Sequence, residues 1–248
     1  WRAEHGSQIG QWMRALGEFE ALCSLATFAF EHPNACYPEL VDGVQFEAHD
    51  LVHPLLPSDT AIANDVQLGS PPLWILSGSN MSGKSTLLRA IGSSVVLAWA
   101  GAPITARSAR ISRLQIGASL RTSDSLTDHR SRFYAEIIRL RGIATLASSG
   151  VPTLFLLDEL LSGTNSQDRR AGAEALVRSL VASGAIGIVT THDLALAEIA
   201  EKIPQGALNM HLEDWLDGSE IRFDYKLKPG TVTRGNALAL MRAIGLAV

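Results

Sequence analysis

Residues 78–86 are the feature that most constrains the fold, because they fit the pattern GxxxxGK(S/T) of phosphate-binding loops. Gly78 and Gly83 allow consecutive backbone amides to approach a phosphate chain closely. Lys84 is expected to reach the β and γ phosphates, and the Ser85 hydroxyl is expected to bind Mg²⁺. The pattern therefore predicts a nucleoside triphosphate site formed by Gly78, Ser79, Asn80, Met81, Ser82, Gly83, Lys84, Ser85 and Thr86.

The sequence on both sides of this loop supplies the elements that such a loop requires. Leu73–Leu76 is a short apolar run typical of a buried strand, and apolar residues recur at helical spacing from Ser85 to about Trp99. The positive end of that helix dipole would face the same anion. The alternative is a chance glycine-rich turn between a strand and a helix.

An acidic pair and a histidine follow two further predicted strands. The apolar run Val151–Leu157 ends in Asp158 and Glu159, which are expected to hold Mg²⁺ and to polarise the attacking water, respectively. His192 follows the next strand, Ala185–Val189, and is expected to sense the γ phosphate, because ligands bind at the carboxyl ends of strands in open parallel sheets. The alternatives are surface carboxylates at a strand end and a structural histidine.

The other periodicities complete an α/β pattern with a parallel or mixed sheet flanked by helices. The first predicted helix carries an apolar stripe that is expected to face the core. The predicted elements are a helix over Ile9–Phe30, a strand over Leu40–Asp50, strands and loops over Ile104–Ala118, a polar loop over Gly117–His129, helices over Ser131–Leu146 and Ala171–Ser183, a strand over Ile221–Leu227 and a helix from Asn236 to about Ile244.

Composition excludes some classes of protein. The 248 residues, 46% of them hydrophobic, suffice for one large α/β domain with a short leading segment. The net charge of −4 argues against a main nucleic-acid-binding surface within this chain. No apolar run reaches the ~18 residues of a membrane span. Cys23 and Cys36 lack CxxC spacing, so we expect packing roles and a cytoplasmic location. Because the chain begins at Trp1, it is expected to come from a longer protein.

Two other polar segments have ordinary explanations. His49 and His53 have the spacing of HExxH, but Asp50 replaces the Glu and a proline follows, so a metal site is not expected. The three arginines between residues 107 and 113 indicate a solvated face.

Several segments together carry a family resemblance. The Asn-Met pair of the phosphate loop is similar to the pattern GPNMxGKST. Other segments agree in order with the same family, namely His53-Pro54, Asn64-Asp65, Ser131 to Glu136, Leu157 to Glu159 with Gly163-Thr164, Thr191-His192, Asn209 to His211 and Tyr225 to Leu227. The combination resembles the C-terminal ATPase domain of the MutS family of DNA mismatch repair proteins, which belongs to the ABC-type branch of phosphate-loop ATPases.

This resemblance implies an ABC-type phosphate-loop fold, with a mostly parallel sheet flanked by helices and a short N-terminal helical segment. Residues 1–36 would end a helical connecting region, and residues 37–248 would form the ATPase domain. The implied activity is Mg²⁺-dependent hydrolysis of ATP, with Glu159 and His192 as catalytic groups and with Ser85 and Asp158 on the metal.

The resemblance also implies a homodimer in which each ATP site is completed by the partner. Ser131 would act in trans on the γ phosphate, whereas Asn80 would contact phosphate in cis. Leu161–Gly163 is similar to the start of the transporter signature LSGGQ, but it follows Asp158 and Glu159 instead of preceding them. This order disfavours a transport ATPase with a membrane partner and assigns the segment to the dimer interface.

Some positions depart from the family pattern. Ala61 stands where an aromatic residue usually stacks on adenine, so Tyr225 or Phe223 is expected to supply the ring. Asp193 follows His192 in place of the usual Tyr, and Arg132 replaces a Thr.

The expected role is mismatch repair, in which ATP moves DNA-binding domains outside this chain, with repair-pathway proteins as candidate partners. A mismatch-reading Phe-x-Glu element is absent from the sequence. The alternative is therefore a MutS-like ATPase that acts on DNA structures or in recombination without recognising mismatches.

Overall fold

The computed structural model describes residues 1–57, 59–120, 132–161, 165–217 and 220–232. Several sequence predictions fall wholly or partly outside these residues. They are the trans role of Ser131, most of the polar loop over Gly117–His129, the end of Leu161–Gly163, the Gly163-Thr164 pair and the helix expected from Asn236.

The centre of the fold is a six-stranded sheet in the order β10-β9-β4-β8-β7-β6. Each neighbouring pair is parallel except β10 and β9, which form an antiparallel hairpin, so the predicted parallel or mixed sheet is confirmed. The strands are β4 (Leu73–Ser77), β6 (Gln115–Ser119), β7 (Thr153–Leu157), β8 (Ile186–Thr191), β9 (Ala207–Asp217) and β10 (Glu220–Pro229).

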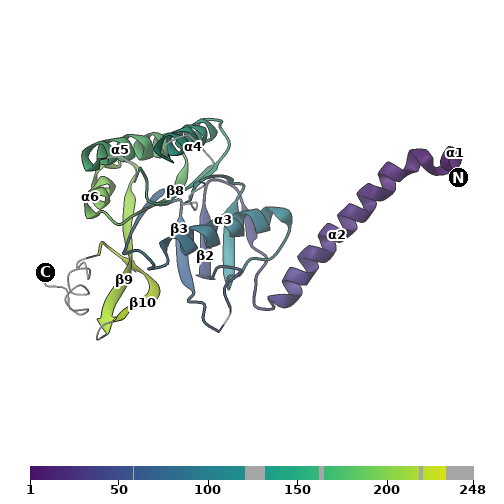
Figure 1. Cartoon of the computed structure of the whole chain (residues 1–248), viewed down its shortest axis with the longest axis horizontal. Helices are drawn as coiled ribbons and strands as arrows, with labels where there is room; N and C mark the ends of the chain where they lie inside the picture. Colours follow the sequence, from purple (N-terminus) through teal and green to yellow (C-terminus); the bar gives the residue numbers. More distant parts are fainter. Residues whose placement is uncertain (58, 121–131, 162–164, 218–219, 233–248) are drawn as a thin grey trace.

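Side chains of the central strands alternate between two separate cores, as the period of a strand requires. In β4, Leu73 and Ile75 point to one core, whereas Trp74 and Leu76 point to the other. The first core lies under the helices α4 (Arg132–Ala147), α5 (Ser166–Ala182) and α6 (Leu194–Ala197). The 3₁₀ helix η2 (Glu198–Lys202) follows α6 directly and also contributes residues to this core. Figure 1 shows α4 and α5 side by side along this face.

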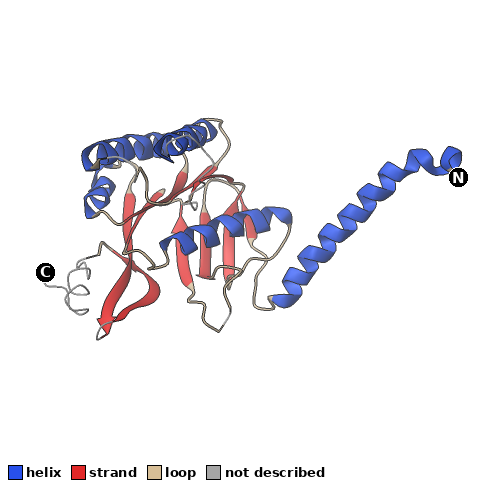
Figure 2. Ribbon diagram, viewed as in Figure 1, coloured by secondary structure: helices blue, strands red, loops and turns tan. Residues whose placement is uncertain are grey.

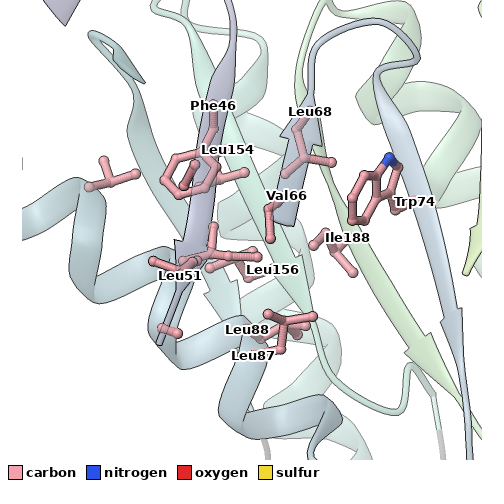
Figure 3. Close-up of a cluster of buried hydrophobic side chains, with 14 of the residues drawn as sticks. Phe46, Leu51, Val66, Leu68, Trp74, Leu87, Leu88, Leu154, Leu156 and Ile188 are labelled. Atoms are coloured by element: carbon pink, nitrogen blue, oxygen red, sulfur yellow. The ribbon is translucent and has the colours of Figure 1, made fainter. Parts of the chain in front are cut away.

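The opposite core contains α3 (Lys84–Ala100) and a second sheet that the sequence did not predict. This sheet has the order β1-β5-β2-β3, with β1 (Glu39–Val41), β2 (Phe46–Leu51), β3 (Asn64–Leu68) and β5 (Ser108–Ser112). Figure 3 shows Phe46 of the second sheet beside Leu154 of the central sheet, and Val66 near Leu156 and Ile188. One hydrophobic core thus fixes both sheets and the helix that follows the phosphate loop.

Several predicted boundaries were wrong. The single strand expected over Leu40–Asp50 is divided into β1 and β2, because the chain turns at Gly43, whose φ is +94°. Gly117–Ser119 belongs to β6 and not to a loop, since its backbone pairs with β7. Strands β3 and β9 were missed, although Val66 and Leu68 in β3 and Leu208, Met210 and Leu212 in β9 alternate with polar residues as strand residues do.

The first long helix, α2 (Ile9–Glu31), has the predicted extent but does not face the core. None of its residues is buried, and it extends away from the two sheets after the short α1 (Arg2–His5) and η1 (Gly6–Gln8) (Figures 1 and 2). Cys23 on this helix is exposed and packs in neither core of the described residues, so the packing role predicted for it is wrong. Cys36 is half-buried, and both cysteines are free thiols. Periodicity specifies an apolar helix face, whereas tertiary structure decides what covers it.

Helices in the described ranges include none that combines the length and hydropathy needed to cross a bilayer.

A glycine in β8 provides a test of the packing between β7 and β8. A Cβ at Gly187 would overlap Phe155 O and lie 2.5 Å from the Phe155 ring. We therefore expect Gly187→Ala to lower the free energy of unfolding by about 3 kcal/mol, measured by urea denaturation followed by circular dichroism.

Gly142→Ala is the matched control, because Gly142 lies in α4 with no atom within 4 Å of the added Cβ. It should raise the free energy of unfolding by about 0.5–1 kcal/mol through helix propensity. Equal effects of the two substitutions would contradict the close packing at Gly187.

Candidate functional site

The phosphate loop joins β4 to α3 in a conformation that needs both of its glycines. A Cβ on Gly78 would lie 2.8 Å from Ser82 Oγ and 2.9 Å from Leu212 O, which is closer than a side chain tolerates. Gly83 has a φ of +101°, and an added Cβ would lie 3.2 Å from the Tyr225 ring. The loop is thus folded tightly against β9 and β10.

Lys84 is the first residue of α3, and its ammonium group is directed back into the loop. Its Nζ donates hydrogen bonds to Gly78 O at 2.8 Å and Ser79 O at 2.6 Å, and the residue is only 5% exposed. Burial lowers the pKa of Lys84, while the nearby carboxylates, chiefly Glu159, oppose this shift. A buried ammonium group attracts an anion more strongly than one in water does.

Two buried hydroxyl groups in the loop could donate hydrogen bonds to a ligand. Ser79 Oγ and Ser82 Oγ are buried and make no hydrogen bond within the part of the chain that the structure describes. Buried polar atoms normally have partners, so an unpaired pair beside Lys84 fits a loop that receives phosphate oxygens.

The carboxyl ends of β7 and β8 meet the start of α3 in a hydrogen-bond network. Ser85 Oγ donates to Asp158 Oδ2 at 2.7 Å, and Thr190 Oγ1 donates to Asp158 Oδ1 at 2.6 Å. Thr190 Oγ1 also accepts from the Glu159 amide at 2.9 Å. No role for Thr190 was predicted from the sequence, although its place directly after the apolar run Ala185–Val189 was an available signal.

The oxygens of Ser85 and Asp158 are a donor set that suits Mg²⁺, which is bound by few protein carboxylates and completes its shell with phosphates and water. The described residues contain no cluster of three or more His, Cys, Asp or Glu that could hold a metal ion by protein ligands alone. His49 and His53 belong to no such cluster among the described residues.

Glu159 and His192 lie together beside this network. Glu159 Oε1 is 3.6 Å from His192 Nδ1, and the Glu159 side chain is 10% exposed whereas that of His192 is 48% exposed. Glu159 has a φ of +51°, so its backbone is held in a sparsely populated conformation. Glu136 Oε1 accepts a hydrogen bond from Leu161 N at 2.8 Å and thereby ties α4 to the segment after Glu159.

A cavity of about 660 Å³ extends from the phosphate loop toward the second sheet. Its loop side includes Lys84 and Ser85, and its far side is mainly apolar. Burial lowers the pKa of His53 on that side, and the charge of Arg89 acts in the same direction, so His53 is neutral near pH 7. The residues of the far side are Leu51, Val52, His53, Leu56, Thr60, Ile62, Asn64 and Tyr225.

Most of the residues predicted for the site are therefore brought together. The cavity is lined by Asn80, Met81, Gly83, Lys84, Ser85, Thr86, Glu159 and Tyr225. Met81 is 85% exposed, so most of its side chain faces solvent. Phe223 stacks on Tyr225 with ring centroids 5.7 Å apart, but it does not line the cavity. Apart from Tyr225, the far side was not predicted, because its residues come from β2, from β3 and from the segment between these strands, whose position beside the phosphate loop has no local signal in the sequence.

The fold and this site define an α/β nucleotide-binding domain. The sequence matches the family model of MutS domain V over residues 74–247, which is more than half of the chain. The chain belongs to the MutS family, whose members have a C-terminal ATPase domain.

Individual relatives are similar over most of the chain. The DNA mismatch repair protein MutS of Natronomonas pharaonis is 29% identical over 96% of this chain and 28% of its own length. The DNA mismatch repair protein MutS of Methanosarcina mazei is 28% identical over 98% of this chain and 27% of its own length. Endonuclease MutS2 of Thermus thermophilus is 32% identical over 82% of this chain and 27% of its own length. The chain thus spans little more than a quarter of these relatives.

The Thr190 hydroxyl group offers a test of the network around Asp158. Thr190→Val would leave Asp158 Oδ1 and the Glu159 amide without this partner, and we expect the free energy of unfolding to fall by about 1–3 kcal/mol in urea denaturation. Thr190→Ser retains the hydroxyl group and should cost less than about 1 kcal/mol, the value of one buried methyl group. Equal losses would show that the hydroxyl group does not contribute.

Proposed function

We propose that this chain is an ABC-type, Mg²⁺-dependent ATPase domain. The observation that carries the proposal is the contact between Ser85 of the phosphate loop and Asp158 at the end of β7, with Glu159 next in the chain and within the same cavity. Phosphate-loop ATPases place a loop hydroxyl group and a strand-end carboxylate together to hold Mg²⁺. Such proximity between residues 73 positions apart favours this arrangement over a chance glycine-rich turn.

The proposed roles of the residues follow from their positions. Backbone amides of the loop and the Lys84 ammonium group bind the phosphates, while Ser79 and Ser82 contribute their unpaired hydroxyl groups. Mg²⁺, when bound through Ser85 and Asp158, would neutralise charge on the phosphates. Glu159 orients the attacking water and accepts its proton. His192 senses the γ phosphate from a position 3.6 Å from the Glu159 carboxylate.

The base of the nucleotide is proposed to lie on the apolar side of the cavity. Tyr225 lines this side next to Gly83, close to the phosphate loop, and its aromatic ring can stack on adenine. Asn80 would contact phosphate in cis. Ile62, the neighbour of Ala61, provides a further apolar contact in the absence of an aromatic residue there.

We further propose that residues 37–248 form the ATPase domain and dimerise around two ATP molecules. Residues 1–36 would belong to a connecting helical region, and the exposure of α2 supports this division. Ser131 would act in trans on the partner's ATP. The segment after Glu159, which Glu136 ties to α4, would lie at the dimer interface.

The wider role is proposed to be mismatch repair, because several relatives carry that name. DNA would be bound by domains that the relatives have outside the region matched here, which agrees with the net charge of −4. A role on DNA structures without mismatch recognition is the second candidate, and the similarity to an enzyme named Endonuclease MutS2 favours it.

Two substitutions separate binding from hydrolysis. Glu159→Gln should keep ATP affinity within about twofold while lowering the steady-state rate of ATP hydrolysis by about 10²–10⁴-fold, because it removes the group that accepts the proton from water. Lys84→Ala should weaken ATP binding itself by at least about tenfold, measured by calorimetry, because the loop loses its cation.

The control for both substitutions is Glu201→Gln, which alters an exposed carboxylate in η2 and should change neither ATP affinity nor the rate of hydrolysis. The proposed dimer is tested separately: light scattering of the Glu159→Gln variant with ATP should detect a dimer. Near-normal ATP turnover by Glu159→Gln would show that Glu159 does not accept the proton from water. Unchanged ATP affinity of Lys84→Ala would show that Lys84 does not bind the phosphates.

The two wider roles are distinguished by ATP turnover of the full-length protein. The rate is measured without DNA, with a matched duplex and with the same duplex carrying one mismatch. A change of severalfold that requires the mismatch is expected for the repair role. If neither duplex changes the rate of ATP turnover, the role without mismatch recognition is favoured and the ATPase proposal stands.

A further inference from the structure

Tyr225 lies in an irregular part of the hairpin formed by β9 and β10. The two strands pair regularly from Glu220 to Phe223 and again from Leu227, but the register shifts between Phe223 and Leu227. Tyr225 has a φ of +53° within this bulge, a conformation that is unfavourable for a residue with a bulky side chain. Something must therefore hold the bulge in place.

Asn64, the first residue of β3 in the second sheet, makes the contacts that hold this bulge. Its Nδ2 donates to Tyr225 O at 2.9 Å, and its Oδ1 accepts from Leu227 N at 2.7 Å. The two ends of one amide group thus bind the main chain on both sides of residue 226. Tyr225 lies in the stretch of β10 that is not paired with β9, and Leu227 is the residue at which the pairing resumes, so Asn64 contacts the bulge and its far end.

Neighbouring contacts also hold the bulge of β10 against the start of β3. Lys226 Nζ donates to Ala63 O at 2.6 Å, and the side chain of Leu227 packs against the core that contains α3. Asn64 also lines the cavity with Tyr225. The amide group consequently connects the second sheet to the hairpin of the central sheet at the edge of the cavity.

The chemistry of the contact requires an amide group in particular. Tyr225 O is an acceptor and Leu227 N is a donor, so the side chain must offer one donor and one acceptor at the same time. A carboxylate would place an acceptor against Tyr225 O, and an alanine would leave both main-chain groups without this partner.

We propose that Asn64 is a positioning residue for nucleotide binding, which holds the β10 bulge so that the Tyr225 ring stays beside Gly83 and faces the base. The inference rests on the proposed binding of ATP in this cavity. It assigns to Asn64 an effect on the base and none on the phosphates, because the phosphate loop makes its own contacts through Lys84 and the loop backbone.

The test compares two ligands in the full-length protein, ATP and inorganic tripolyphosphate, which has no base. Asn64→Ala should weaken ATP binding by about tenfold and leave tripolyphosphate binding within about twofold, measured by calorimetry in Mg²⁺. Asn64→Asp should weaken ATP binding at least as much as Asn64→Ala does. Asn34→Ala is the matched control, because Asn34 is exposed in a turn outside the cavity and should change neither affinity.

A double-mutant cycle distinguishes positioning from a general structural role. If Asn64 acts through the Tyr225 ring, Asn64→Ala should cost less than about twofold in ATP affinity once Tyr225→Ala is present. Additive losses, or an equal loss of tripolyphosphate affinity, would overturn the inference. Failure of the wild-type protein to bind either ligand would instead overturn the proposed function.

Discussion

The contact between Ser85, Asp158 and Thr190 is the constraint on which the site depends. It joins the start of α3 to the ends of β7 and β8, three points that are distant in the sequence. Its polar atoms are largely shielded from water, and a buried carboxylate is tolerated only when donors surround it. Thr190, which satisfies Asp158, also accepts a hydrogen bond from the Glu159 amide and so helps to fix Glu159 in the lining of the cavity.

The rest of the fold brings these groups within reach of one another. Alternating side chains of the central strands fill one core beneath α4 and α5 and another beside α3 and the second sheet. Because α3 packs in the second core, the phosphate loop is held between β4 and the hairpin of β9 and β10. Apart from Tyr225 of β10, the apolar side of the cavity comes from β2, β3 and the segment between them, so the surfaces proposed for the phosphates and for the base arise mainly from different layers of the molecule.

The sequence predicted the parts of this arrangement that are encoded locally. The phosphate loop, the apolar runs before it and before Asp158, and the helix over Ile9–Phe30 each have their signal within one short segment. The sequence could not predict β3, the exposure of α2, or the roles of Thr190 and Asn64. These depend on which strands become neighbours, and the two hydrogen bonds of Asn64 cross more than 160 positions of sequence.

The division of the cavity between two sheets also has a thermodynamic consequence. A nucleotide that touches both the loop and the far side links the sheets non-covalently, and it does so only in the folded protein. By mass action, ATP at 100 times its dissociation constant would add about 2.7 kcal/mol to the free energy of unfolding. The domain would then be most resistant to proteolysis while nucleotide is bound, so the cellular lifetime of the protein would follow the nucleotide supply.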